Sequence, residues 1–162
     1  MLLEERAKRV KLLLMDCDGV LTDGRLYFGP TGEELKVFDV RDGQGIVMWH
    51  RAGFRSGIIT GRDSPIVELR ANSLGIEFVR QGVNDKTVVL DELLVLAEVT
   101  PDEVAFIGDD VPDLEVMRSV GLAVAVADAM DVIKEAAFYV TEKNGGRGAV
   151  RELIDLLLSA KV

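Results

Sequence analysis

Residues 11–19 read KLLLMDCDG, an apolar run of strand length that ends in two aspartates and a glycine. A short apolar run without polar alternation is typical of a strand that is buried on both faces of a parallel sheet. Similar runs recur further along the chain, at 57–60, 77–79, 104–108 and 122–125. The sequence therefore predicts five buried strands, and the first of them leads directly into acidic residues.

Stretches with the helical spacing of apolar residues lie between and after these strands, at 45–51, 65–74, 86–97, 114–120 and 149–158. Strands that alternate with helices favour parallel βαβ units. We therefore expect an α/β fold in which a doubly wound parallel sheet carries helices on both faces. Ligands of such sheets bind beyond the carboxyl ends of the strands.

One segment departs from this alternation. Residues 25–29 and 34–40 alternate apolar and polar side chains around a Pro-Thr-Gly turn at 30–32, which predicts a β-hairpin over about 24–40 that projects from the loop after the first strand. Repeats and Pro- or Ser-rich linkers are absent from the sequence. We expect residues 1–162 to form a single domain.

The composition limits the partners and the metals of the chain. Its 162 residues are 48% apolar and 29% charged, and 19 Lys and Arg against 28 Asp and Glu give a net charge of −9. A nucleic-acid backbone or an anionic membrane surface would repel such a chain, so neither is expected as a partner. The apolar run at 10–15 is too short for a membrane span or a secretory core, which predicts a cytoplasmic protein. A single cysteine and a single histidine exclude an internal disulfide and a zinc site with nitrogen and sulfur ligands.

Polar residues follow three of the predicted strands and would meet at one edge of the sheet. They are Asp16 and Asp18 after the first strand, Thr60, Gly61 and Arg62 after the second, and Asp109, Asp110 and Asp113 after the fourth. Several carboxylates in one crevice need a compensating cation, and a hard divalent ion with oxygen ligands is the natural candidate. We expect Mg²⁺.

The pair Asp16 and Asp18 suits phosphoryl transfer. One carboxylate can attack phosphorus while the other donates a proton to the leaving oxygen and later takes one from water, and their environments decide which does which. Thr60 can offer a hydroxyl and a backbone N–H to the phosphoryl oxygens, and Lys86 a positive charge. Arg62 would lie near the phosphate or near a carboxylate of the substrate.

Four motifs in order, DCDGVLT at 16–22, Thr60, Lys86 and GDDVPD at 108–113, resemble the haloacid dehalogenase-like phosphatase superfamily over essentially the whole chain. This resemblance implies that Asp16 is the aspartyl nucleophile and Asp18 the general acid and base. It also implies that Thr60 and Lys86 bind phosphate, and that the side chains of Asp16 and Asp109 and the backbone carbonyl of Asp18 hold Mg²⁺. Asp110 and Asp113 are supporting residues, either of which could reach the ion through water.

Longer strings narrow the resemblance: LTDGRLYFGPTGEELKVFDVRDGQGI (21–46), IITGRDS (58–64), GDDVPDLEVM (108–117), VAVADA (124–129) and NGGRGAVRE (144–152). They are similar to the 3-deoxy-D-manno-octulosonate 8-phosphate phosphatase family. The resemblance implies hydrolysis of that sugar-acid phosphate in lipopolysaccharide precursor synthesis, by a homotetramer. A related phosphatase of a nine-carbon sugar-acid 9-phosphate shares these motifs, so the alternative substrate stays open, as does a phosphotransferase such as a mutase.

The chain leaves no room for a cap domain over the site. Residues 19–59 must supply both the hairpin and a helix, and residues 61–85 supply another helix and a strand. An open site would admit water and give little selectivity. We expect a homo-oligomer in which apolar hairpin residues, and the 145–147 segment with Arg147, reach the site of a neighbouring chain.

Several residues have plainer interpretations. Cys17 is expected to be a buried, reduced thiol, and His50 a packing or surface residue. The glycine-rich stretch 145–148 is expected to be flexible, and whether Arg147 within it carries charge to the site is open from the residues alone. A phospho-receiver signalling domain also combines acidic residues, Thr and Lys on a doubly wound sheet, but its acceptor aspartate comes later in the chain.

Overall fold

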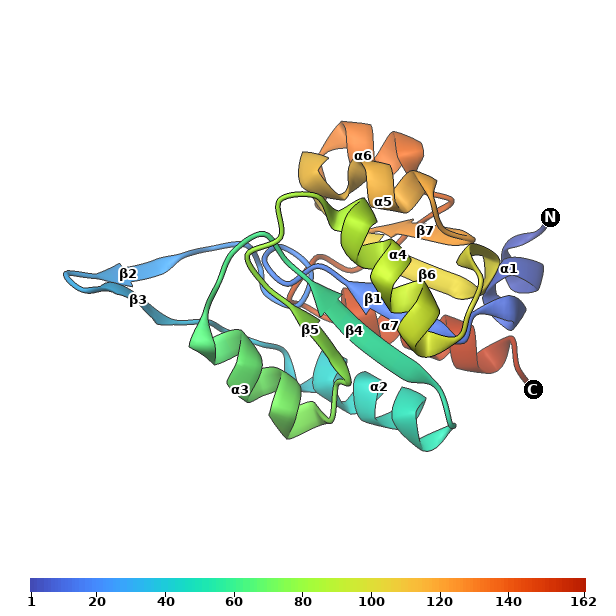
Figure 1. Ribbon diagram of the computed structural model, residues 1–162, viewed down its shortest axis with the longest axis horizontal. Helices are drawn as coiled ribbons and strands as arrows, with labels where there is room; N and C mark the ends of the chain where they lie inside the picture. Colours follow the sequence, from blue (N-terminus) through green and yellow to red (C-terminus); the bar gives the residue numbers. More distant parts are fainter.

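The computed structural model describes residues 1–162 and is built on a six-stranded parallel sheet (Figure 1). The strand order is β5-β4-β1-β6-β7-β8, and the strands are β1 Leu12–Met15, β4 Arg55–Ile59, β5 Phe78–Arg80, β6 Val104–Gly108, β7 Leu122–Ala125 and β8 Tyr139–Val140. The chain winds from β1 outward to β5 and then returns to β6 on the other side of β1. The sheet therefore reverses its winding between β1 and β6, where such sheets bind ligands. The predicted doubly wound α/β fold is confirmed.

Helices cover the sheet in two groups that pack within themselves. One group contains α2, α3 and α7 and the other α4, α5 and α6. The helices are α1 Leu3–Arg9, α2 Val40–Arg51, α3 Pro65–Leu74, α4 Lys86–Ala97, α5 Leu114–Arg118, α6 Asp131–Ala136 and α7 Ala149–Ser159, with 3₁₀ turns at Pro101–Glu103 and Val111–Asp113. A single cluster of 38 buried apolar residues lies between sheet and helices. No helix combines the length and the apolarity that a membrane crossing requires.

The predicted hairpin is present but shorter than expected. Its strands are β2 Tyr27–Gly29 and β3 Gly32–Leu35, which pair antiparallel in a sheet of their own and project away from the body of the molecule (Figure 1). The prediction that the second strand continues to residue 40 is wrong. The Asp39 carboxylate accepts the N–H groups of Arg41 and Asp42, so it caps α2, which begins at Val40 rather than at residue 45.

Three short elements escape the sequence patterns: α1, α6 and the two-residue strand β8. Polar residues interrupt the apolar spacing in α1 and α6, and β8 has only two residues, so none of the three shows a clear period. Strand β5 also lies one residue later than predicted, at Phe78–Arg80. None of these differences affects the point between β1 and β6 at which the sheet reverses its winding, and no cap covers that point.

Candidate active site

The loop after β1 is held in shape by its own backbone. The carbonyl of Cys17 accepts the N–H groups of Val20, Leu21 and Thr22, and the Thr22 hydroxyl accepts those of Gly19 and Gly24. Gly19 has φ +84°, and a Cβ there would overlap the Asp109 carboxylate. This 16–24 segment, here called the catalytic loop, therefore holds Asp16 and Asp18 in fixed positions next to the end of β6.

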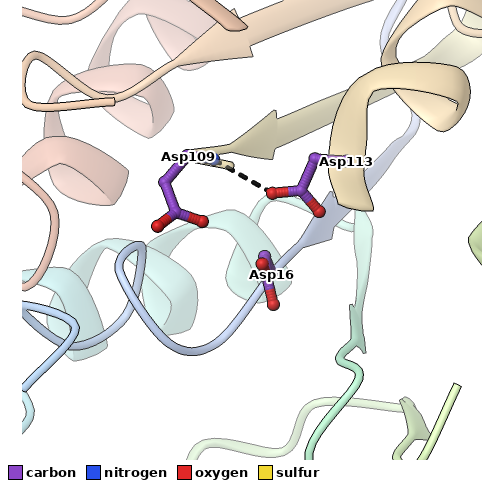
Figure 2. Close-up of side chains that lie close together, drawn as sticks. All are labelled: Asp16, Asp109 and Asp113. Atoms are coloured by element: carbon purple, nitrogen blue, oxygen red, sulfur yellow. Dashed lines mark hydrogen bonds between the residues drawn. The ribbon is translucent and has the colours of Figure 1, made fainter. Parts of the chain in front are cut away.

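Three carboxylates meet where β1 and β6 end (Figure 2). Asp16, Asp109 and Asp113 each offer one oxygen, and these oxygens lie within 4.8 Å of one another. Burial and the charge of Asp113 raise the pKa of Asp16 to about 7. Burial and the charge of Asp16 raise the pKa of Asp109 to about 8. The cluster is therefore fully ionised only at a cost, because the protein compensates its negative charge only in part.

Lys86 is the cation that reaches this cluster. It is the first residue of α4, whose N-cap Asp85 accepts the N–H of Thr87. Its Nζ lies 2.6 Å from Asp113 Oδ1 and 3.2 Å from Asp16 Oδ2, and its side chain is almost fully buried. Burial acts to lower the pKa of Lys86, but the two carboxylates outweigh it and hold that pKa above its ordinary value.

The remaining hydrogen bonds distinguish a carboxylate that orients its neighbours from one that has an oxygen without a partner. Asp113 accepts Lys86 on Oδ1 and the Asp109 N–H on Oδ2, at 3.0 Å (dashed in Figure 2). Both of its oxygens are therefore engaged. Asp109 Oδ1, in contrast, is buried and has no hydrogen-bond partner. A buried carboxylate oxygen without a donor is costly unless a cation accompanies it, so the oxygen donors of Asp109 and Asp16 fit a divalent ion such as Mg²⁺.

A cavity of about 310 Å³ opens above this cluster. It brings together the predicted site residues with the exception of Asp113, which lies beneath its floor, and of Arg147. The lining is Asp16, Asp18, Gly24, Leu26, Thr60, Gly61, Arg62, Lys86, Asp109, Asp110 and Pro112. Asp110 also caps the 3₁₀ turn that precedes α5 by accepting the N–H of Val111. Most of the side chains that line the cavity are charged or polar, and Leu26 and Pro112 are the apolar ones.

Two hairpin residues that the sequence did not indicate contact the site. Lys36, whose side chain is only 3% exposed, places Nζ 2.7 Å from Asp18 Oδ1 and 3.2 Å from Glu33 Oε2. Glu33 also accepts Arg62 Nη2 at 3.0 Å and the Ser64 hydroxyl at 2.8 Å. Although burial opposes it, the Asp18 carboxylate raises the pKa of Lys36. Charged residues within an alternating segment indicate a solvated strand face, so the sequence offered no signal for this contact.

The glycine-rich stretch before α7 is packed, so the expectation of flexibility is wrong. The Gly146 N–H donates to the Val20 carbonyl at 2.8 Å and the Gly145 N–H to Asp128 at 2.9 Å. A Cβ on Gly145 would overlap the backbone of Gly19, and one on Gly146 the backbone between residues 22 and 23. These glycines therefore allow this turn to lie directly on the catalytic loop of the same chain.

Arg147 lies outside the catalytic cavity of its own chain. Its side chain is 68% exposed, with Nη2 4.0 Å from Asp23 Oδ2. It borders a second cavity, of about 320 Å³, at the root of the hairpin, lined by Asp23, Val37, Phe38, Asp39, Arg41, Gly146 and Arg147.

Cys17 and His50 have the plain roles that the sequence indicates. Cys17 is fully buried, and burial raises the pKa of its thiol to about 12, so it is not a nucleophile. The His50 ring bonds the Ser56 hydroxyl at 2.6 Å and does not line the catalytic cavity.

This fold and site define a haloacid dehalogenase-like hydrolase. The doubly wound sheet carries Asp16 and Asp18 after β1, Thr60 after β4 and Asp109 after β6, with Lys86 on α4. The model of that family matches residues 66–154. The 3-deoxy-D-manno-octulosonate 8-phosphate phosphatase of Yersinia pestis is 50% identical over 97% of this chain and 84% of its own, and that of Escherichia coli K12 is 48% identical over 96% and 83%. The chain belongs to this family of phosphatases.

Solved structures agree with this assignment. The crystal structure of the Yersinia pestis phosphatase superposes with a TM-score of 0.96, covering 98% of this chain and 85% of that one at 50% identity. The Moraxella catarrhalis phosphatase, solved in complex with a magnesium ion, a phosphate ion and a KDO molecule, gives 0.95 at 39% identity, covering 98% and 91%.

Proposed function

We propose that this chain is a Mg²⁺-dependent phosphomonoesterase that hydrolyses 3-deoxy-D-manno-octulosonate 8-phosphate to the free sugar acid and phosphate, in lipopolysaccharide precursor synthesis. The observation that carries the proposal is the meeting of Asp16, Lys86 and the unpartnered Asp109 oxygen at the floor of one polar cavity. The relatives named above support the choice of substrate.

The reaction divides into two displacements at phosphorus. In the first, an Asp16 oxygen forms a bond to phosphorus, the bond to the sugar oxygen breaks, and Asp18 donates a proton to that oxygen. In the second, a water oxygen bonds to phosphorus, the bond to Asp16 breaks, and Asp18 takes the proton from water. The Thr60 hydroxyl, the Gly61 N–H and the Lys86 ammonium would hold the phosphoryl oxygens throughout, since all three residues line the cavity.

Mg²⁺ would be held by the carboxylates of Asp16 and Asp109 and by the backbone carbonyl of Asp18, with Asp110 and Asp113 in support. When bound, the ion supplies positive charge that stabilises the charge developing on the phosphoryl oxygens. Asp113 acts on the site without touching substrate, because it orients Lys86 and the backbone of Asp109. Arg62, at the rim of the cavity, would contact the phosphate or the sugar-acid carboxylate.

The test is phosphate release from purified protein, with and without Mg²⁺, on the eight-carbon sugar-acid 8-phosphate and on its nine-carbon 9-phosphate homologue. We expect Mg²⁺-dependent turnover and a higher kcat/KM for the eight-carbon substrate. A higher value for the nine-carbon substrate would identify the alternative phosphatase. Transfer of phosphate to a second sugar would indicate a mutase, and a stable phosphoprotein without turnover would indicate a receiver domain.

We further propose that residues 1–162 act as one cytoplasmic catalytic domain within a homotetramer. Exposed apolar side chains gather on the hairpin and its flanks, at Leu26, Tyr27, Phe28, Leu35, Val37 and Val40. Such a patch is costly in water, and copies of the chain packed on one another would cover it. The hairpins would then close neighbouring sites, in the place of the absent cap.

In this assembly Arg147 serves the catalytic cavity of a neighbouring chain, where its exposed guanidinium would bind the anionic substrate. Arg147→Ala should raise KM several-fold and leave the melting temperature within about 1 °C. An unchanged KM would contradict this role. A wild-type monomer that is fully active in sedimentation and activity measurements would contradict the assembly itself.

A further inference from the structure

The hairpin reaches the catalytic loop of its own chain through a group of charges, which we call the hairpin clamp: Glu33, Lys36, Asp18 and Arg62. Lys36 follows directly after β3 and its ammonium is buried between two carboxylates, Asp18 and Glu33. Glu33 in turn bonds Arg62 and the hydroxyl of Ser64, both in the loop after β4. The clamp therefore joins three parts of the chain that the sheet alone leaves separate.

The two oxygens of Asp18 have different surroundings within the clamp. Oδ1 accepts the hydrogen bond from Lys36 at 2.7 Å. Oδ2 receives no hydrogen bond and lies 3.4 Å from the Nε of Arg62, which lines the catalytic cavity together with Asp18. With Oδ1 held, rotation of the carboxylate is restricted, and Oδ2 is the oxygen left to exchange a proton with a ligand.

We propose that Lys36 is a positioning residue for proton transfer, which fixes Asp18 so that Oδ2 faces the leaving oxygen and later the attacking water. The inference rests on the proposed phosphatase function. Lys36 does not line the catalytic cavity and pairs with Asp18 and Glu33 rather than with Asp16, so its effect passes through Asp18. The proton itself moves between Asp18 and the sugar oxygen or water, as in the two displacements above, and Lys36 keeps its own protons.

The substitution Lys36→Met keeps the unbranched side chain up to Cε and removes the donor. General acid–base catalysis contributes about 10²- to 10⁴-fold, and loss of its orientation forfeits part of that. We expect kcat on the sugar-acid phosphate to fall roughly 10- to 100-fold with KM changed less than about 3-fold. Lys11→Met is the matched control, since Lys11 pairs with Glu103 on the surface at the opposite end of β1, and it should leave kcat unchanged.

An aryl phosphate ester as substrate distinguishes a loss of Asp18 positioning from general damage to the site. The p-nitrophenolate ion leaves without a proton, so the first displacement on p-nitrophenyl phosphate needs no acid, whereas the second still needs Asp18 as base. In Lys36→Met we expect the pre-steady-state burst of p-nitrophenolate to keep its rate within about 3-fold, and the steady-state rate to fall with that of the sugar phosphate. A burst slowed as much as the steady state would overturn the inference.

A double-mutant cycle gives the second readout. If Lys36 acts through Asp18, adding Lys36→Met to the Asp18→Asn variant should lower its activity by less than about 3-fold. If the double variant instead loses the product of the two single effects, Lys36 does not act through Asp18. Should Lys36→Met fail to fold, Lys36→Arg keeps the charge and changes its reach, and the same burst comparison applies to it. A wild-type protein that releases no phosphate from any sugar-acid ester contradicts the proposed function instead, so the two failures are distinguishable.

Discussion

Asp16 is a carboxylate at the end of a buried strand, and the fold keeps it there at a cost in stability. Burial and the charge of Asp113 raise its pKa to about 7, so the ionised form is disfavoured by the folded protein. Only the Cys17 N–H and the Lys86 ammonium favour that form. A residue selected for stability alone would not be acidic here, so the position reflects chemistry.

The first prediction tests that chemistry. Asp16→Asn should lower phosphate release by roughly 10³-fold or more, because an amide oxygen does not form the covalent intermediate. The circular dichroism spectrum should not change, since the amide has the shape of the carboxylate. The melting temperature without metal should stay the same or rise, because a charge is removed from the buried cluster. Retained turnover would show that another residue is the nucleophile.

The second prediction concerns pH. The folded-state pKa values of Asp16 and Asp109, about 7 and about 8, lie above the ordinary value of 3.8, so the folded protein binds more protons than the unfolded chain. Without metal, the free energy of unfolding should therefore fall as pH rises from about 4 to 8. Mg²⁺ competes with those protons, so its addition should raise the melting temperature more at pH 8 than at pH 5.5. Thermal melts at both pH values check this, and an equal rise at both would contradict it.

At the residue scale the sequence predicts the acidic groups well and misses their partners. Asp16, Thr60 and Asp109 each come directly after a strand, and strand ends of a parallel sheet meet at one edge whatever the loops do. Lys36 and Glu33 lie on a hairpin whose course no local pattern determines. Lys36 reaches Asp18, and Glu33 reaches Lys36 and Arg62, only because β3 ends at Leu35 and the chain then turns toward α2.

At the scale of elements, the turn before α7 completes the catalytic loop. Asp42 on α2 is buried and accepts the N–H groups of Gly148 and Arg151, so α2 holds the start of α7 in place. Burial raises the pKa of Asp42 to about 6. Gly45 lets Arg151 approach α2 closely and Gly43 lets Arg70 do so, which explains why these two glycines occur inside that helix.

The third prediction compares two glycines with the same kind of backbone. Gly146 and Gly53 both have positive φ, +68° and +90°, so alanine at either costs about 1–2 kcal/mol. At Gly53 the new Cβ meets nothing, whereas at Gly146 it overlaps the catalytic-loop backbone. Gly146→Ala should therefore destabilise more and lower kcat at least about 10-fold, while Gly53→Ala leaves kcat unchanged. Denaturant unfolding and initial rates measure both, and equal kcat in the two variants would show that this contact does not support the site.

The elements that the sequence predicts are those whose apolar residues form a compact run or a helical spacing. The five predicted strands and helices α3, α4 and α7 are close to their predicted bounds. The expectation of flexibility at the glycine cluster is wrong because composition alone cannot tell a flexible stretch from one packed on a neighbouring backbone. That distinction depends on contacts between residues far apart in the sequence.

At the scale of the whole molecule, the site of this acidic protein has little free positive charge. Lys86 is paired with Asp16 and Asp113, and Arg62 with Asp18 and Glu33. A phosphorylated sugar acid therefore needs the charge of the metal to bind. Inorganic phosphate should bind weakly or not at all without Mg²⁺ and measurably with it. Isothermal titration calorimetry with and without EDTA checks this, and equal affinity in both would contradict it.

The last prediction concerns assembly. Val37 flanks the hairpin and Val95 lies on α4, and both side chains are more than half exposed. Val37→Asp should shift the sedimentation coefficient toward smaller species, because it places a charge in the proposed contact between copies, and should lower activity with it. Val95→Asp is the matched control and should change neither. Dissociation by both variants, or by neither, would place the contact elsewhere.

The packing of Gly145 and Gly146 on the catalytic loop also bears on when the protein becomes active during its synthesis. The loop follows the first strand of the sheet, yet the hydrogen bond from Gly146 to Val20 comes from near the other end of the chain. Synthesis proceeds from the N-terminus, and contacts this distant in sequence form late. A nascent chain that contains Asp16 and Lys86 but not yet Gly146 still lacks the support of its catalytic loop, so we expect hydrolytic activity to begin only after residue 146 has been synthesised.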